Sequence, residues 1–326
     1  MEKSVETFKE SKHFRLHRVA DGVFAAISVP GTGSVGNAAI IDLGDKTIVV
    51  DTFTTIQAAE DLQAAAISVT GNSASYVINT HWHSDHTSGN QVFTPNAPII
   101  STTATRDIMA AFGVNRINEQ LTNLESIFRS LDELEEKLQK EKDKKLQEEM
   151  KWGIASDREY MKILPNLLYT LPSITFDRGL SIHGSERSVQ LFSFGGGHTQ
   201  SDTFVYLPEE KIAVMGDLVL SKHHPVLNHA NPKEWLHILE RIESLDIEII
   251  IPGHGEVCSM EQVYQVKGYI KDIMTLVAES MESDTNIDDI SVPEAYQDWY
   301  FTTYFKTNLK KVYELLTAPE RSIKVD

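Results

Sequence analysis

The feature that most constrains the fold of this chain is the run THWHSDH at residues 80–86. It brings the metal-ligand types His81, His83, Asp85 and His86 together directly after an apolar run that predicts a buried strand. Zinc and similar cations accept imidazole nitrogen and carboxylate oxygen as ligands. In an extended segment His81 and His83 project to one side, whereas Asp85 and His86 can turn toward a second position. The run therefore predicts a strand-end loop that supplies ligands to two metal ions.

Four residues cannot complete two coordination spheres, so further ligands are required downstream. Three candidates share one context, in which an apolar run is followed by glycine and then by a ligand-type residue: His198, Asp217 and His254. Glycine lets the backbone approach a crowded metal centre closely. We therefore expect these three residues, each at the end of a strand, to complete the metal centre begun by the 80–86 run.

Length, charge and cysteine content limit the cellular setting and the partners. The 326 residues, 41% of them hydrophobic, can bury a large core. A net charge of -17 argues against nucleic acid and anionic membranes as partners, which favours a small-molecule substrate. Residues 1–20 hold no apolar run that would direct secretion, so we expect a cytoplasmic protein. The single cysteine, Cys258, excludes an intrachain disulfide.

The remaining sequence predicts two β-rich halves separated by helices. Strands are expected at 22–29, 37–43, 46–51, 75–79, 188–194, 202–207, 211–215 and 248–251, and helices at 56–69 and 232–244. This order indicates a layered α/β architecture in a single domain over residues 1–326. A helical insertion is expected at about 102–170, and a helical C-terminal portion from about 260.

The expected insertion carries an amphipathic seam at alternating three- and four-residue spacing, formed by Leu124, Phe128, Leu131, Leu134 and Leu138. From 132 to 151 the sequence is dense in Glu and Lys of mixed sign, which suits a solvated helix face. We interpret the region as a helical hairpin that packs over the α/β body or against a second subunit. A homo-oligomer formed through this insertion is one consequence of that interpretation.

The ligand runs resemble the metallo-β-lactamase superfamily. Its hallmarks are a His-x-His-x-Asp-His loop, a Gly-His-Thr segment, a Gly-Asp turn and a Pro-Gly-His-Gly segment, and all four occur here in order. The similarity spans about 22–257 and includes Asp51, which in the family usually buttresses the histidine loop. The resemblance implies an αββα sandwich. It also implies that one ion is held by His81, His83 and His198, the other by Asp85, His86 and His254, with Asp217 bridging both.

This division of ligands suits hydrolysis. Three neutral histidines leave the first ion its positive charge and an open position, which lowers the pKa of bound water toward neutrality. Asp85 is the expected catalytic residue, because it can orient the resulting hydroxide while the second ion stabilises negative charge in the tetrahedral intermediate. We expect two Zn²⁺ ions per chain, with iron or manganese as alternatives.

The expected activity is metal-dependent hydrolysis of an ester, thioester, lactone or amide bond, the last including β-lactam-like bonds. Lactamases of the family place a cysteine where Asp217 stands. A bridging aspartate is more typical of its thioesterases, lactonases and phosphodiesterases, which disfavours β-lactam resistance. The alternatives are a phosphodiesterase, a non-hydrolytic iron-dependent enzyme, and a catalytically inactive binding protein. The last is disfavoured because no ligand is missing.

Other polar residues near Asp217 are candidates for substrate contact. His223 and His224 follow it closely in the sequence, and we predict that they reach a substrate at the metal centre. Asn228 and His229 are weaker candidates of the same kind. The substrate itself is not specified by the metal ligands, because selectivity in such a fold resides in loops and insertions.

Overall fold

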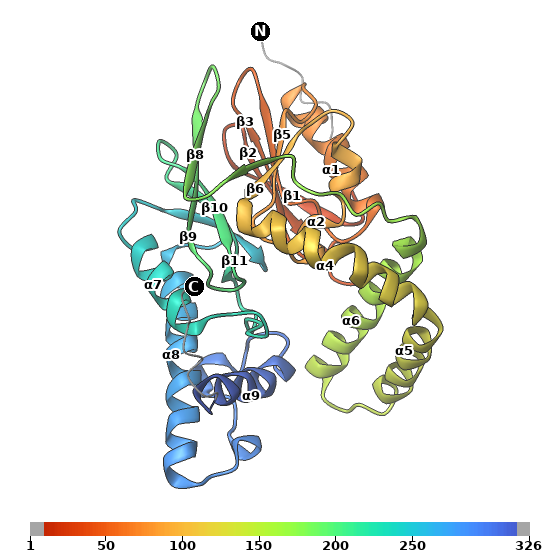
Figure 1. Cartoon of the computed structure of the whole chain (residues 1–326), viewed down its shortest axis with the longest axis vertical. Helices are drawn as coiled ribbons and strands as arrows, with labels where there is room; N and C mark the ends of the chain where they lie inside the picture. Colours follow the sequence, from red (N-terminus) through yellow and green to blue (C-terminus); the bar gives the residue numbers. More distant parts are fainter. Residues whose placement is uncertain (1–9, 318–326) are drawn as a thin grey trace, which may run out of the picture.

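The computed structural model describes residues 10–317 and contains two facing β-sheets (Figure 1). The 7-stranded sheet has the order β1 (Phe14–Ala20), β2 (Val23–Ser28), β3 (Ala38–Asp42), β4 (Thr47–Val50), β5 (Tyr76–Ile78), β6 (Ile99–Thr102) and β7 (Ile174–Phe176). The 5-stranded sheet has the order β12 (Ile249–His254), β11 (Ile212–Leu220), β10 (Asp202–Leu207), β9 (Ser188–Gly195) and β8 (Gly179–His183).

Helices flank the two sheets and form the insertion and the C-terminal portion. They are α1 (Ile56–Thr70), α2 (Ser84–Thr87), α3 (Asn90–Phe93), α4 (Thr103–Thr122), α5 (Leu124–Leu138), α6 (Lys144–Ile163), α7 (Pro232–Ile242), α8 (Met260–Ser283) and α9 (Thr303–Thr317). Within residues 10–317, no helix has the length and apolar character needed to cross a membrane. Residues 1–9, part of the segment searched for a secretion signal, lie outside the described residues.

Three buried layers show why the sheets stack. Val50 and Val214 belong to the core between the two sheets. Leu62 of α1 packs on the outer face of the first sheet, and Trp235 of α7 with Tyr269 of α8 on the outer face of the second. Each buried large apolar side chain contributes about 1.5–3 kcal/mol, which favours covering both faces of both sheets. The result is the expected αββα sandwich.

Several strand ends differ from the sequence prediction. β11 continues to Leu220, so Asp217 lies inside a strand and not after one. The register between β11 and β12 shifts at Gly216, whose φ of 51° is left-handed, and such a bulge redirects the side chain that follows. β12 runs through to His254 itself. β1, β6, β7 and β8 were not predicted, because they are short or carry charged residues on the exposed face.

The strand directions gather the polar loops at one edge of the sandwich. β4, β5 and β6 are parallel to one another, and β11 is parallel to β12. The carboxyl ends of β4 and β5 therefore meet, which brings Asp51 beside the 80–86 loop. Ligand sites commonly occupy the carboxyl ends of parallel strands, because the loops there converge.

The region predicted as a helical insertion contains α4, α5 and α6. Leu131 of the seam is buried against Ile117 of α4 and Met161 of α6, whereas Leu134 is 37% exposed. In Figure 1, α5 and α8 lie on opposite sides of the lower part of the molecule, with α6 and α9 between them. Lys145 of α6 donates hydrogen bonds to the carbonyls of Gln297 (2.8 Å) and Trp299 (2.5 Å) in the segment that precedes α9.

Candidate metal centre

The seven candidate ligands come from five parts of the fold and meet at one edge of the sandwich. His81 and His83 follow β5, Asp85 and His86 lie on α2, His198 lies in the loop between β9 and β10, Asp217 lies in β11, and His254 ends β12. Because these segments lie in or next to buried strands, the fold can hold the ligand side chains in position before an ion binds.

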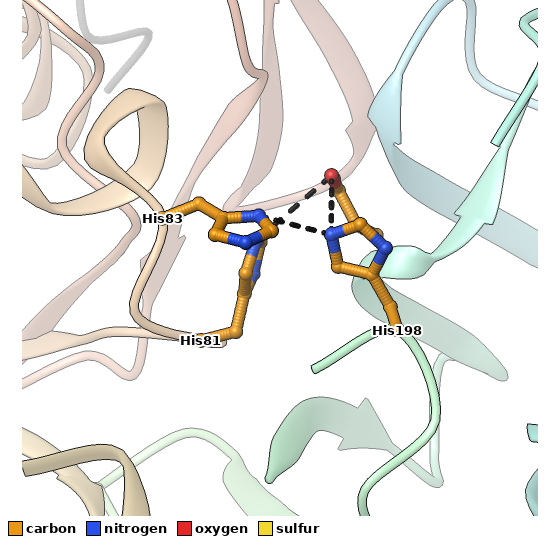
Figure 2. Close-up of side chains that lie close together, drawn as sticks. His81, His83 and His198 are labelled. Atoms are coloured by element: carbon orange, nitrogen blue, oxygen red, sulfur yellow. Dashed lines mark hydrogen bonds and ion pairs between the residues drawn. The ribbon is translucent and has the colours of Figure 1, made fainter. Parts of the chain in front are cut away.

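The first ligand group consists of His81, His83, His198 and Asp217, whose ligand atoms all lie within 4.8 Å of one another. Figure 2 shows the three imidazole rings turned toward a common point. His83 Nδ1 lies 3.0 Å from His198 Nε2, and His198 Nε2 lies 3.3 Å from Asp217 Oδ2. These spacings suit three or four ligands around one cation.

The second ligand group consists of Asp85, His86 and His254, whose ligand atoms also lie within 4.8 Å of one another. Asp85 Oδ2 lies 3.4 Å from His86 Nε2 and 3.3 Å from His254 Nε2. The two histidines therefore turn the same ring nitrogen toward one carboxylate.

Asp217 contacts both groups. Its Oδ1 lies 3.2 Å from His86 Nε2 of the second group. Its Oδ2 lies 3.3 Å from His198 Nε2 of the first group and 3.4 Å from His254 Nε2 of the second. A carboxylate in this position has one oxygen available for each of two ions.

Buried polar atoms without partners test whether this site fits a metal. His81 Nε2, His86 Nε2 and Asp217 Oδ1 are inaccessible to solvent and form no hydrogen bond of good geometry with any described residue, although His86 Nε2 and Asp217 Oδ1 lie 3.2 Å apart as an ion pair. An unpaired buried polar atom costs about 1–3 kcal/mol, and a charged one costs more. Divalent cations would satisfy all three atoms at once, and the histidine and carboxylate donor set is one that zinc accepts.

Comparison with known proteins bears on the same residues. The family model described as the metallo-beta-lactamase superfamily matches residues 31–254, which is more than half of the chain and includes all seven candidate ligands. The chain belongs to the metallo-beta-lactamase superfamily.

Solved structures agree on the fold. A metallo-beta-lactamase from Pontibacter korlensis superposes with a TM-score of 0.58 at 16% identity, covering 79% of this chain and 99% of that one. The structure of TMB-1 superposes with a TM-score of 0.56 at 17% identity, covering 79% of this chain and 97% of that one. At such identities the likeness establishes the shared sandwich and says nothing about the substrate.

The electrostatics of this superfamily site differ between the two groups. Burial lowers the pKa of His81 well below its usual range and that of His198 to about 4. Burial would also lower the pKa of His86, but the carboxylates of Asp217 and Asp85 raise it well above its usual range. The first group therefore offers neutral imidazoles, whereas in the second the carboxylates of Asp85 and Asp217 favour protonated imidazoles when no metal cation is present.

Asp51 supports the histidine loop, the role that the family resemblance implies for it. Its carboxylate accepts hydrogen bonds from the Thr80 backbone N–H and hydroxyl, both at 2.8 Å, and contacts His86 Nδ1 at 2.8 Å. The Thr80 hydroxyl also lies 3.0 Å from His81 Nδ1. One buried carboxylate thereby orients a ligand of each group, as outer partners of metal-binding histidines do.

Asp202 performs a comparable function for the His198 loop and was not among the residues predicted from the sequence. Its carboxylate accepts hydrogen bonds from the backbone N–H groups of Gly197 (2.7 Å) and Thr199 (3.1 Å) and from the Thr199 hydroxyl (2.7 Å). Burial raises the pKa of Asp202 to about 7. The available signal was an acidic residue at the first position of an otherwise apolar strand.

His229 contacts a candidate ligand, although the sequence offered it only as a weak substrate contact. Its Nδ1 lies 3.0 Å from His83 Nε2, and its ring lies 4.7 Å from the ring of Trp82. This contact engages His83 Nε2 and leaves His83 Nδ1 to face His198. His229 therefore orients the ring of His83.

The two histidines predicted to meet substrate lie in different surroundings. His223 is partly buried, with its ring 6.2 Å from that of His254 and 5.5 Å from that of Phe301, so it stands beside the second ligand group. His224 is 1% exposed, and its Nδ1 lies 3.0 Å from the Tyr269 hydroxyl in the core. A side chain so enclosed cannot meet a substrate, and the structure does not support that role for His224.

Proposed function

We propose that this protein is a hydrolase with a dinuclear metal centre that holds two Zn²⁺ ions and cleaves an ester, thioester, lactone or amide bond. The observation that carries the proposal is the position of Asp217 between two groups of ligand atoms, each group spanning no more than 4.8 Å. The buried Nε2 atoms of His81 and His86 support it, because they form no hydrogen bond and would cost stability in a protein that binds no metal.

The residues at the centre have separable roles in this proposal. Bound divalent ions would lower the pKa of a water ligand and polarise the carbonyl oxygen of the substrate. Asp85 accepts a hydrogen bond from the attacking water and so orients it toward the substrate, because its carboxylate lies among the ligands and is partly exposed. Asp51 and His229 hold ligand side chains in place, and Asp202 holds the backbone on either side of His198, so that the site is preorganised.

The aspartate at position 217 favours substrates other than β-lactams. The only cysteine, Cys258, is paired through its backbone with Ile250 and is in neither ligand group. Burial raises the pKa of its thiol to about 12, which makes it a poor thiolate ligand. The second ion would therefore be held by oxygen and nitrogen alone, the donor set that the family resemblance associates with thioesterases, lactonases and phosphodiesterases.

A substrate panel tests this proposal. Zinc-loaded protein is assayed on an activated ester, a thioester, a lactone, a β-lactam and a bis-aryl phosphodiester, beside His83→Ala and the surface control His237→Ala. We expect turnover of at least one of the carbonyl substrates other than the β-lactam, loss of that turnover in His83→Ala and wild-type rates in His237→Ala. Activity confined to the phosphodiester, or equal activity in His83→Ala, would exclude the proposal.

A further inference from the structure

A hollow lies between the histidine loop and the helical insertion. Trp82 and Ser84 of the loop line one side, and Phe112 and Ile117 of α4 with Tyr169 line the other. It contains about 390 Å³ of space outside the atoms, including its opening to solvent. Much of this space is open solvent, so the hollow is a shallow surface that can cover one face of a flat group and does not enclose a whole ligand.

The lining is mainly apolar and aromatic and includes one cation, Arg116 of α4. Among residues 10–317, Arg116 forms no hydrogen bond and no ion pair. Burial raises the pKa of the Tyr160 and Tyr169 phenols, which also line the hollow, and the positive charge of Arg116 offsets part of that rise. Phe112, which lines the same hollow, is 64% exposed, so its large apolar ring remains in contact with water.

The hollow shares a wall with the metal centre. Trp82 stands between the ligands His81 and His83 in the sequence, and its ring contacts the His83 ring at 4.6 Å and the His229 ring at 4.7 Å. Ser84 stands between His83 and Asp85. A group held against Trp82 is therefore separated from the ligands of the first group by a single side chain.

We propose that this hollow binds an apolar arm of the substrate that ends in a carboxylate, with Arg116 as its counter-ion. The inference rests on the proposed hydrolase function, because the arm is placed beside the centre that would cleave the bond. Arg116 presents a planar fork of N–H donors that matches a carboxylate. Arg116 is exposed where it lines the hollow and has no ion-pair partner among residues 10–317, so it favours an acid over a neutral or cationic group.

Binding of a non-hydrolysable probe tests the hollow without the metals. Metal-depleted protein is titrated calorimetrically with naphthylacetate and with its neutral analogue naphthylacetamide. We expect the acid to bind about tenfold more tightly than the amide. Arg116→Gln abolishes this preference, whereas Arg129→Gln, an exposed arginine of α5, keeps it. Equal affinity for acid and amide, or a preference that survives Arg116→Gln, would overturn the inference.

Kinetics then test whether the bound group is an arm of the substrate. Zinc-loaded protein is given aryl-alkyl esters that end in a free carboxylate or in its methyl ester. Arg116→Gln should raise KM for the acid about tenfold and leave KM for the capped ester unchanged. Inhibition by naphthylacetate that lowers kcat without raising KM would contradict the substrate-arm assignment. If neither ester is hydrolysed, the proposed function fails, while the binding experiment still decides whether the hollow selects acids.

Discussion

The Asp51 carboxylate lies 2.8 Å from Nδ1 of His86, and the same carboxylate holds the backbone N–H and hydroxyl of Thr80. With Nδ1 as the donor, Nε2 of His86 is left to face Asp85 and Asp217. The φ of Asp51 is 61°, a left-handed conformation that asparagine also adopts readily. Asparagine at position 51 would therefore remove the negative charge while retaining the preference for this left-handed backbone conformation.

Asp51→Asn should weaken binding of the metal beside His86 by about 10–100-fold, because an outer partner of a ligating histidine sets its tautomer and basicity. Zinc affinity is measured by competition with a fluorescent chelator. The matched control is Asp61→Asn, which alters a similar 2.8 Å contact to His13 away from the ligand groups. Equal zinc affinity in Asp51→Asn and Asp61→Asn would show that Asp51 stabilises the fold alone.

The contrast between Asp51 and Asp202 shows what the sequence could and could not predict. The sequence named all seven members of the two candidate groups, four from the compact 80–86 run and three from positions that follow an apolar run and a glycine, because both patterns are local in the chain. The order of the strands in each sheet and the position of Asp217 inside β11 depend on pairing between distant segments. The bonds of Asp202 and the contact between His229 and His83 are tertiary, and no local pattern specifies them.

Removing the metals should lower stability as well as activity. Ions that bind only the folded chain stabilise it by about 2.7 kcal/mol when present at a hundred times their dissociation constant. Treatment with a chelator should therefore lower Tm in the wild type and change it far less in His81→Ala, whose first ligand group is incomplete. Calorimetry with and without chelator measures both shifts. An unchanged wild-type Tm, in protein shown by elemental analysis to have lost its metal, would mean that no ion stabilises the fold.

Asp217→Ala should reduce metal content from about two ions toward one and lower the rate strongly, because Asp217 is the only ligand whose two oxygens face both groups. Stability should fall with the lost ion. Elemental analysis gives the number of ions per chain. The control is Asp246→Ala, which removes an exposed carboxylate that belongs to neither ligand group. Retention of both ions in Asp217→Ala would refute the bridging assignment.

Asp202 should make the stability of the metal-free protein depend on pH. The pKa of its carboxyl is 3.8 in a model peptide and is raised to about 7 by burial in the folded chain. Between these values the folded state holds a proton that the unfolded state has lost, so stability falls as pH rises. We expect the free energy of unfolding of the wild type, relative to Asp202→Asn, to decrease from pH 5 to pH 7.5, as measured by urea titration in chelator. A constant difference would exclude a raised pKa at Asp202.

The helical insertion supports the segment that lies beside the second ligand group. Lys145 of α6 binds the carbonyls of Gln297 and Trp299, and the ring of Trp152 lies 5.2 Å from that of Tyr300. The backbone of Tyr300 in turn pairs with the residues around His223. A contact on α6 is thereby linked, through one extended segment, to the surroundings of the metal centre.

Lys145→Ala should release the segment 297–302 without releasing metal, because it removes two hydrogen bonds from a charged donor and touches no ligand. We expect a loss of about 1–3 kcal/mol of local stability and faster amide hydrogen exchange at Tyr300, with metal content at the wild-type value. Lys144→Ala removes an exposed neighbour on the same helix and should change neither property. Loss of metal from folded Lys145→Ala would show instead that the insertion holds the ligands themselves, whereas unchanged exchange at Tyr300 would show that the contact contributes nothing to the wall.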